Sequence, residues 1–195
     1  MVRGGIGFSI VSVLGFSVWA FLAPWLQRVL GAFALFPACL LVFLGSAGLL
    51  LHPLVSGPNR LWRFYKLFVP AFCAYAAAWC AAWFALGFGL GEWLGSFLGS
   101  MAFAAVIGLG FGNFSCFFKA SVVLFICHSA GYFLGAELMR AAGRASGLVS
   151  LSKPTLNLLG KLGWGAIYGV GFGAGIGYVF HCLQKPTATA QSQGS

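Results

Sequence analysis

The stretch GWGAIYGVGFGAGIGYVF, residues 163–180, contains seven glycines among eighteen residues, and the other eleven are apolar or aromatic. In water, glycine is about 1 kcal/mol less favourable than alanine at each interior position of a helix. A bilayer core holds no water to compete for backbone hydrogen bonds, so a helix there tolerates glycine. The stretch therefore predicts a membrane-spanning helix rather than a helix of a soluble domain.

The whole chain has the composition of a membrane protein. Of its 195 residues, 61% are hydrophobic and 7% are charged, whereas a soluble domain carries roughly 25% charged residues. The apolar residues fall in runs of about 20, the length of a helix that crosses a hydrocarbon core of ~30 Å. We therefore expect an all-α fold, a polytopic α-helical integral membrane protein that forms one domain over residues 1–184.

We predict six membrane-spanning helices, at about residues 5–23, 32–51, 67–86, 94–112, 120–139 and 162–182. Pro37 is expected to kink the second helix. Four basic residues between positions 140 and 161 indicate a loop there, with at most a short helix on the membrane surface. Residues 185–195 lack apolar periodicity and are expected to form a disordered polar tail.

The third and fourth helices are joined by a segment with almost no charge. Residues 67–118 contain one charged residue, Glu92, in 52 positions, which is too long for one helix and long enough for two. We expect a tight hairpin with its tip near residues 87–93, where Glu92 faces water. The alternative is that residues 87–100 form a re-entrant segment.

The basic residues suggest lipid as a partner but hardly define the orientation. The net charge is +9, which fits affinity for anionic lipid headgroups. The basic residues are dispersed among loops, so nucleic-acid binding is not indicated. Six Lys and Arg residues lie on the side of the termini and five on the opposite side, almost no imbalance for the positive-inside rule. We expect both termini in the cytoplasm.

Glycines spaced by four predict close helix packing. In lipid, small residues at this spacing let helix backbones approach each other, and we therefore expect glycine-zipper packing. The stripes comprise Gly165, Gly169, Gly173 and Gly177 in the sixth helix, Gly131 and Gly135 in the fifth, and Gly95 and Gly99 in the fourth. The spacing does not name the partner, which is another helix of the chain or another subunit.

Two questions about these glycines stay open at the level of sequence. The fourth-helix series extends back to Gly87 and Gly91, and either all four lie on one stripe or the first two belong to the turn. The sixth helix carries more glycine than one contact face needs. Either it is packed on two sides, as in an oligomer, or its backbone lines a narrow passage or touches a flat cofactor.

Polar residues inside a membrane are costly and are functional candidates by default. The chain has no aspartate and two glutamates. His128 lies near the middle of the fifth span, where its imidazole needs a partner: Ser129, Tyr132 or a residue on another helix. It is either a structural histidine satisfied by that partner or the main candidate for a pore or ligand site. The other candidates for such a site are Glu92, Asn113, Lys119 and Glu137.

Each of these other candidates also has an ordinary structural explanation. Glu92 suits the water-facing tip of the hairpin, and Asn113 and Lys119 suit the end of one helix and the start of the next. Glu137 lies three residues before Arg140, a spacing that favours an ion pair on a helix surface.

No catalytic residue, metal site or cofactor is predicted. The chain lacks Gly-x-Ser-x-Gly, His-Glu-x-x-His and the phosphate-binding P-loop, and its six cysteines show no metal-binding spacing. Small residues after His128, at positions 129–131, would leave room for a haem or chlorin. Histidine pairs at haem-binding spacing are absent from the predicted helices, so no cofactor is expected.

Two functions of different class fit these observations. The first is a small channel or transporter, homo-oligomeric, for a neutral or anionic small solute, since acidic residues for a proton relay are scarce. The second is a non-catalytic accessory or assembly subunit, whose glycine faces dock onto helices of a larger membrane complex. The first predicts self-association, and the second predicts other transmembrane subunits as partners.

Overall fold

Helices make up nearly all of the computed structural model, which describes residues 1–31, 33–145 and 150–184. Six helices are long and apolar enough to cross a membrane: Val2–Leu30, Leu35–Leu54, Arg60–Leu86, Leu90–Phe111, Phe117–Arg144 and Lys153–Leu183. The predicted all-helical class and the six long apolar helices are thereby confirmed. The predicted polar tail at 185–195 lies outside the described residues.

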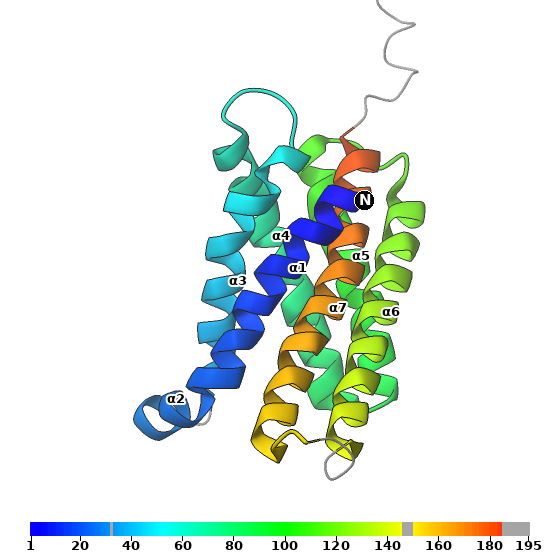
Figure 1. Cartoon of the computed structure of the whole chain (residues 1–195). Coiled ribbons are helices and arrows are strands. Elements are labelled where there is room, and N and C mark those ends of the chain that lie inside the picture. The colour runs from blue at the N-terminus through cyan, green and yellow to red at the C-terminus, as the bar shows by residue number, and fades with distance from the viewer. Residues whose placement is uncertain (32, 146–149, 185–195) are drawn as a thin grey trace, which may run out of the picture.

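The first long helix is bent and has three segments. α1 (Val2–Ser17) passes into a π-helical turn, η1 (Val18–Leu22), and then into α2 (Ala23–Leu30). Pro24 directly follows the π-helical turn and cannot donate a backbone hydrogen bond to it. The helix still continues past the predicted end at residue 23, and α2 turns away from the other helices (Figure 1).

The second helix is not kinked at Pro37. α3 (Leu35–Leu51) begins two residues earlier and continues into a short 3₁₀ turn, η2 (His52–Leu54). Pro37 therefore lies in the first turn of α3, where a backbone N–H has no helical acceptor to lose. The predicted kink is wrong for this reason.

The third and fourth helices form the predicted hairpin, with a shorter turn. α4 (Arg60–Leu86) and α5 (Leu90–Phe111) are joined by residues 87–89. Gly87 and Gly89 have φ values of 71° and 78°, which favour glycine because other residues are strained there. Glu92 lies in the first helical turn of α5 rather than at the tip. Because α5 is continuous, the re-entrant alternative does not fit.

The last two helices are longer than their apolar runs. α6 spans Phe117–Arg144 and α7 spans Lys153–Leu183, so most of the loop or surface helix predicted between 140 and 161 belongs to them. The Ser152 side chain accepts a hydrogen bond from the Thr155 N–H at 3.4 Å, and Pro154 occupies the first turn. These N-terminal signals start α7 nine residues before the predicted boundary.

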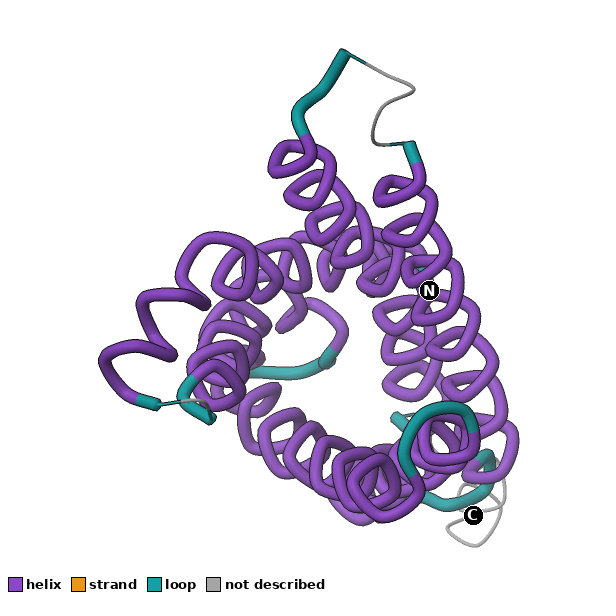
Figure 2. Tube along the Cα trace, turned by 90° about the horizontal axis from the view of Figure 1, so that it is seen from below, coloured by secondary structure: helices purple, strands orange, loops and turns teal. Residues whose placement is uncertain are grey.

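The six long helices form a ring. α7 packs between α1 and α6, α5 packs between α4 and α6, and α3 packs beside α1. Contacts between α3 and α4, the sparsest between neighbours in the ring, close it. Figure 2 shows the bundle along its axis. The first residues of α1 and the last of α7 lie at one end of the ring, the terminal end (Figure 1). The turn at residues 87–89 lies at the other, the turn end.

Phenylalanine rings fill the ring interior towards the terminal end. Phe8 contacts Phe172 with ring centroids 5.2 Å apart, and Phe68 contacts Phe64 and Phe72 at 4.8 and 5.4 Å. We call this cluster the phenylalanine core. Its members, all at most 6% exposed, are Phe8, Phe64, Phe68, Phe72, Phe103, Phe172 and Phe180.

α7 is packed on two sides within the single chain. On the side of α1, a Cβ atom at Gly165 would lie 2.9 Å from Phe16, and one at Gly169 would lie 2.8 Å from the Phe8 carbonyl oxygen. On the side of α6, one at Gly175 would lie 2.6 Å from Leu124. The glycine stripe of the sixth span therefore has α1 as its partner, and further glycines of α7 contact α6.

The other glycine stripes also contact neighbouring helices. On α6, a Cβ atom at Gly131 would lie 3.0 Å from the Ile167 carbonyl oxygen, and Gly135 lies against the Trp164 ring. A second set of glycines on α5 faces α4: Gly91 faces the Ala82 carbonyl, Gly95 the Trp79 backbone and Gly99 the Tyr75 ring. The stripe on α5 thus includes Gly91, as the first alternative predicts. Gly87 belongs to the turn, as the second alternative predicts.

Replacing Gly173 with alanine should lower the stability of the protein by about 1–3 kcal/mol, the usual cost of overpacking. The new Cβ atom would meet the Gly4 carbonyl oxygen and lie 2.5 Å from the Phe8 Cβ, so α1 would have to move. The matched control is Gly45→Ala on α3, where no atom of the described residues lies within 4 Å of an added Cβ. Unfolding temperatures in mild detergent check this, and equal losses in both variants would contradict it.

Candidate functional site

Three helices each direct a pair of ring side chains into the interior of the bundle. Residues four apart lie on one face of a helix, so both members of each pair point the same way. The pairs are Tyr75 and Trp79 on α4, His128 and Tyr132 on α6, and Trp164 and Tyr168 on α7. Because α7 runs opposite to α4 and α6, the six rings form two layers, each with one residue from each helix.

The histidine layer, nearer the terminal end, consists of Tyr75, His128 and Tyr168. The Tyr75 hydroxyl is hydrogen-bonded to Nε2 of His128 at 2.5 Å, and the rings of Tyr168 and His128 are 5.5 Å apart. His128 is 1% exposed, and its Nδ1 atom has no hydrogen-bond partner among the described residues. α5 separates α4 from α6 in the ring, so the bond between Tyr75 and His128 crosses the interior.

The indole layer, nearer the turn end, consists of Trp79, Tyr132 and Trp164. The Tyr132 ring lies 6.1 Å from Trp79 and 5.6 Å from Trp164. The Tyr132 hydroxyl donates a hydrogen bond to Glu92 Oε1 at 2.9 Å. The indole N–H groups of Trp79 and Trp164 are buried without an acceptor among the described residues.

The indole layer borders a cavity of about 570 Å³, which we call the vestibule. Nine of the residues that line it are aromatic: Phe16, Trp19, Phe36, Phe43, Trp79, Trp83, Phe88, Tyr132 and Trp164. Gly15, Leu35, Cys39 and Met139 complete its wall. The wall combines the end of α1 and η1 with the start of α3, the ends of α4 and α6 and the start of α7.

The vestibule reaches the surface at the turn end and is blocked towards the terminal end. Phe36 and Phe88, both in its wall, are 59% and 81% exposed. In the other direction, the histidine layer lies against Phe172, whose ring is 5.2 Å from that of His128, and the phenylalanine core follows. The cavity is therefore closed towards the terminal end, with the indole layer between it and His128.

Glu92 and Glu137, two of the residues singled out from the sequence, lie near the turn end. Glu92 accepts the Tyr132 bond with one carboxylate oxygen and a bond from the Gly89 N–H, at 3.1 Å, with the other. It is thus tied to the indole layer. Glu137 forms a 2.7 Å ion pair with Arg140 on the exposed face of α6, as their three-residue spacing favours.

Asn113 and Lys119 lie at the terminal end, away from the vestibule. Asn113 is buried, and its Nδ2 donates a hydrogen bond to the Leu183 carbonyl oxygen at 3.1 Å. It therefore ties the connection between α5 and α6 to the end of α7. Lys119 is exposed beside Tyr178. The structure does not bring either residue together with His128.

The space beside His128 that the sequence suggested for a macrocycle is filled. A Cβ atom at Gly131 would lie 3.0 Å from the Ile167 carbonyl oxygen, because α7 packs directly on this part of α6. His128 itself is bonded to Tyr75 and surrounded by Tyr132, Tyr168 and Phe172. Of the small residues at 129–131, Gly131 therefore serves helix packing, whereas Ala130 is exposed.

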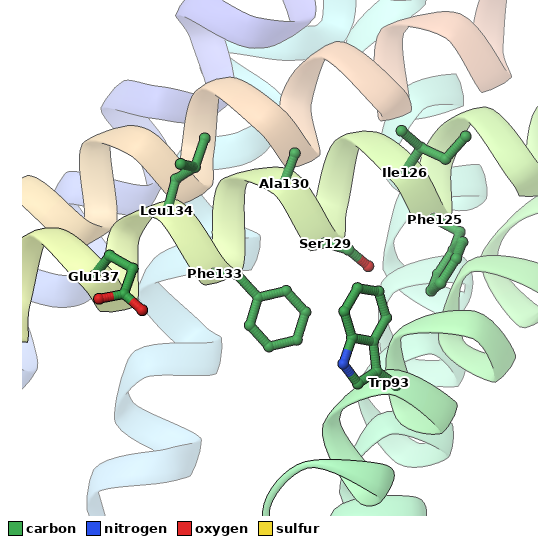
Figure 3. A pocket seen from close by; sticks show the side chains of 8 residues that line it. All are labelled: Trp93, Phe125, Ile126, Ser129, Ala130, Phe133, Leu134 and Glu137. Atoms are coloured by element: carbon green, nitrogen blue, oxygen red, sulfur yellow. The ribbon is translucent and has the colours of Figure 1, made fainter.

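A second hollow, of about 490 Å³, lies on the outside of the ring between α5 and α6. Its wall is mostly apolar, with Trp93 from α5 facing Phe125 and Phe133 from α6 (Figure 3). Ser129 contributes a hydroxyl that has no partner among the described residues, and Glu137 lies at one end of the hollow (Figure 3). Its location on the outer surface separates it from the vestibule.

Sequence reasoning singled out His128, Tyr132 and Glu92 but missed the other aromatic residues around them. Tyr75, Tyr168 and the two tryptophans of the indole layer lie within apolar runs, where aromatic residues are common and do not by themselves indicate a site. A signal was present in the sequence: three predicted spans each contain a tyrosine four residues from a histidine or tryptophan. Only the antiparallel packing turns this repeated spacing into two layers.

Replacing Tyr75 with phenylalanine should lower the free energy of unfolding by about 1–3 kcal/mol, because it leaves the buried imidazole of His128 without its hydrogen bond. Tyr65→Phe is the matched control, since the Tyr65 hydroxyl also donates a hydrogen bond, to the Gly45 carbonyl oxygen at 2.7 Å, but at an exposed site. Unfolding in detergent with increasing denaturant measures both. A loss for Tyr65→Phe as large as that for Tyr75→Phe would show that burial of the imidazole is unimportant.

Comparison of the chain with protein-family models, with curated proteins and with solved structures finds no match. The vestibule and the two layers of ring side chains are therefore the features of the chain that point to a function.

Proposed function

We propose that the chain is a multi-pass membrane protein that acts as a small channel or transporter for a neutral or anionic small solute. The observation that carries the proposal is the vestibule, a blind cavity inside a ring of six helices of membrane-spanning length. In this proposal the vestibule is the entrance of the pathway. The histidine layer and the phenylalanine core close it in the conformation described.

The outer surface of the ring supports insertion into a bilayer. Large apolar side chains on several helices point outwards, among them Leu41 and Leu109, both 70% exposed, and Phe118, 75% exposed. Extensive apolar surface of this kind is unfavourable in water and favourable against lipid tails. With six spans, both termini lie on one side, which we propose to be the cytoplasm.

The histidine layer is suited to act as the gate. The hydrogen bond between Tyr75 and His128 joins two helices that are not neighbours in the ring, so breaking it removes a polar connection across the interior. Ionisable residues within membrane segments are rare, and they mark substrate and ion pathways. A conformational change that separates α4 from α6 would open the way from the vestibule towards the phenylalanine core.

The proposal includes glycine-zipper packing between helices of the same chain. The glycine faces of α7 are occupied by α1 and α6, so they are not free to bind a second subunit. A pathway along the axis of one ring also needs no neighbouring copy. Self-association therefore has to use the outer, lipid-facing surface, and the docking of glycine faces onto foreign subunits loses its main support.

The proposal predicts that vesicles reconstituted with the protein pass at least one small solute faster than protein-free vesicles. Stopped-flow light scattering with urea, glycerol, chloride and benzoate is the measurement. Because Cys39 lies in the wall of the vestibule, its modification by the anionic reagent 2-sulfonatoethyl methanethiosulfonate should slow this flux severalfold. Adding the reagent from one side at a time identifies the side on which the vestibule opens.

Cys39→Ala is the matched control, because the reagent then has no thiol in the vestibule and should leave the flux unchanged. Cys73, exposed on α4, lies outside the vestibule wall and is retained in both proteins. Equal inhibition with and without Cys39 would contradict a pathway through the vestibule. Absence of flux for all four solutes would contradict the transport proposal itself.

Native mass spectrometry of the protein from its own membrane should give a mass at a whole multiple of 20.6 kDa. This outcome is expected of a self-contained homo-oligomer or monomer. A mass that requires other chains would instead support the accessory-subunit function, and the identity of those chains would define it.

A further inference from the structure

We infer that the vestibule selects small aromatic carboxylates. The inference rests on the proposed function in taking the vestibule as the entry site, and it adds the chemical class of the solute. Three features carry it: the aromatic wall, two hydrogen-bond donors without acceptors, and the charge beside the wall.

The wall offers flat apolar surfaces on several sides of the cavity. Trp79 and Trp83 lie nearly parallel, 6.1 Å apart with an interplanar angle of 10°, while Trp19 and Trp164 meet at 74°. Aromatic rings bind other rings through offset stacking and edge-to-face contacts. A cavity of about 570 Å³ falls in the range of roughly 300–1,000 Å³ that is typical of small-molecule sites.

Two residues of the wall need a hydrogen-bond acceptor. The indole N–H groups of Trp79 and Trp164 are buried and have no acceptor among the described residues. An indole N–H can only donate, and a buried donor left unpaired is costly. Both residues line the vestibule with their rings, while neighbouring atoms cover both N–H groups. A solute oxygen therefore becomes their acceptor once the indole rings turn towards the cavity.

The charge near the wall favours an anion. The Lys161 Nζ atom lies 4.6 Å from the centre of the Trp19 ring, and Lys161 precedes the wall residue Trp164 by about one helical turn. The nearest carboxylate linked to the wall, Glu92, already accepts bonds from Tyr132 and Gly89 with its two oxygens. The turn end as a whole carries more basic than acidic side chains, namely Arg28, Arg140, Arg144, Lys153 and Lys161 against Glu92 and Glu137.

The same reasoning disfavours an organic cation, although aromatic walls can bind cations. A cation would be repelled by Lys161 and would leave both indole N–H groups without an acceptor. A carboxylate attached to a ring suits all three features: the ring contacts the wall, the charge is attracted to the lysine, and the oxygens accept from the indole N–H groups once these turn towards the cavity.

The test is protection of Cys39 by three probes of similar shape: benzoate, benzyl alcohol and benzylamine. The native protein is treated with N-ethylmaleimide, and peptide mass spectrometry follows the modification of each cysteine. We expect benzoate to slow the modification of Cys39 at lower concentration than either of the other probes. Cys116, at the terminal end and outside the vestibule wall, is the internal control and should not be protected.

A matched pair of lysine variants tests the charge. Lys161 and Lys66 each lie over a tryptophan ring, the latter 5.2 Å from Trp62 at the terminal end, but only Lys161 is next to the vestibule. Lys161→Gln should raise the benzoate concentration for half-protection about fivefold, as expected for an exposed ion pair, and Lys66→Gln should leave it unchanged. Trp164→Phe, which keeps a ring but removes the N–H, should also weaken protection.

Equal protection by all three probes, or stronger protection by benzylamine, would overturn the inference. So would stronger protection by octanoate than by benzoate, since that result would assign the vestibule to an acyl chain. The outcomes also separate this inference from the proposed function. Protection by benzoate without flux of any solute would remove the transport role and keep the site, while flux through the vestibule without protection would do the reverse.

Discussion

The close contact of α7 with α1 and α6 is the constraint on which the rest of the structure depends. Glycines line both contact faces, so the backbones approach to a distance at which a Cβ atom would collide with a neighbouring backbone. The helices cannot shift along each other easily, because each glycine must stay opposite the part of the neighbouring helix that lies closest to it. The register of α6 against α7 therefore places His128 beside Tyr168 and Tyr132 beside Trp164.

The interior of the ring changes in character along its axis. Towards the terminal end it is filled with phenylalanine rings that have no polar atoms to satisfy. Towards the turn end, tyrosine, histidine and tryptophan bring polar groups into the interior, and several of these groups lack partners among the described residues. Polar groups that are buried without a partner lower the stability of the fold locally. The same part of the interior forms the vestibule rather than a packed core.

The π-helical turn η1 belongs to the same region. Trp19, one of its five residues, lies in the wall of the vestibule and contacts both Phe16 and Trp164. Turns of this type occur often at functional sites, and here one lies next to Pro24, which cannot donate to the preceding turn. The bend that carries α2 away from the ring thus begins beside the vestibule.

The amino-acid sequence alone establishes the helical class, the six long apolar helices and the presence of a histidine at an unfavourable position, because apolar run length and the cost of burying polar groups are local properties. It did not determine the helix ends, since residues such as those at 60–66 and 153–161 extend helices beyond their apolar runs. Which helices the glycines contact, and which rings face one another, depends on how the helices pack. Residues 75, 128 and 168 become one layer only when antiparallel helices far apart in the chain pack at a particular register, and no local pattern encodes that register.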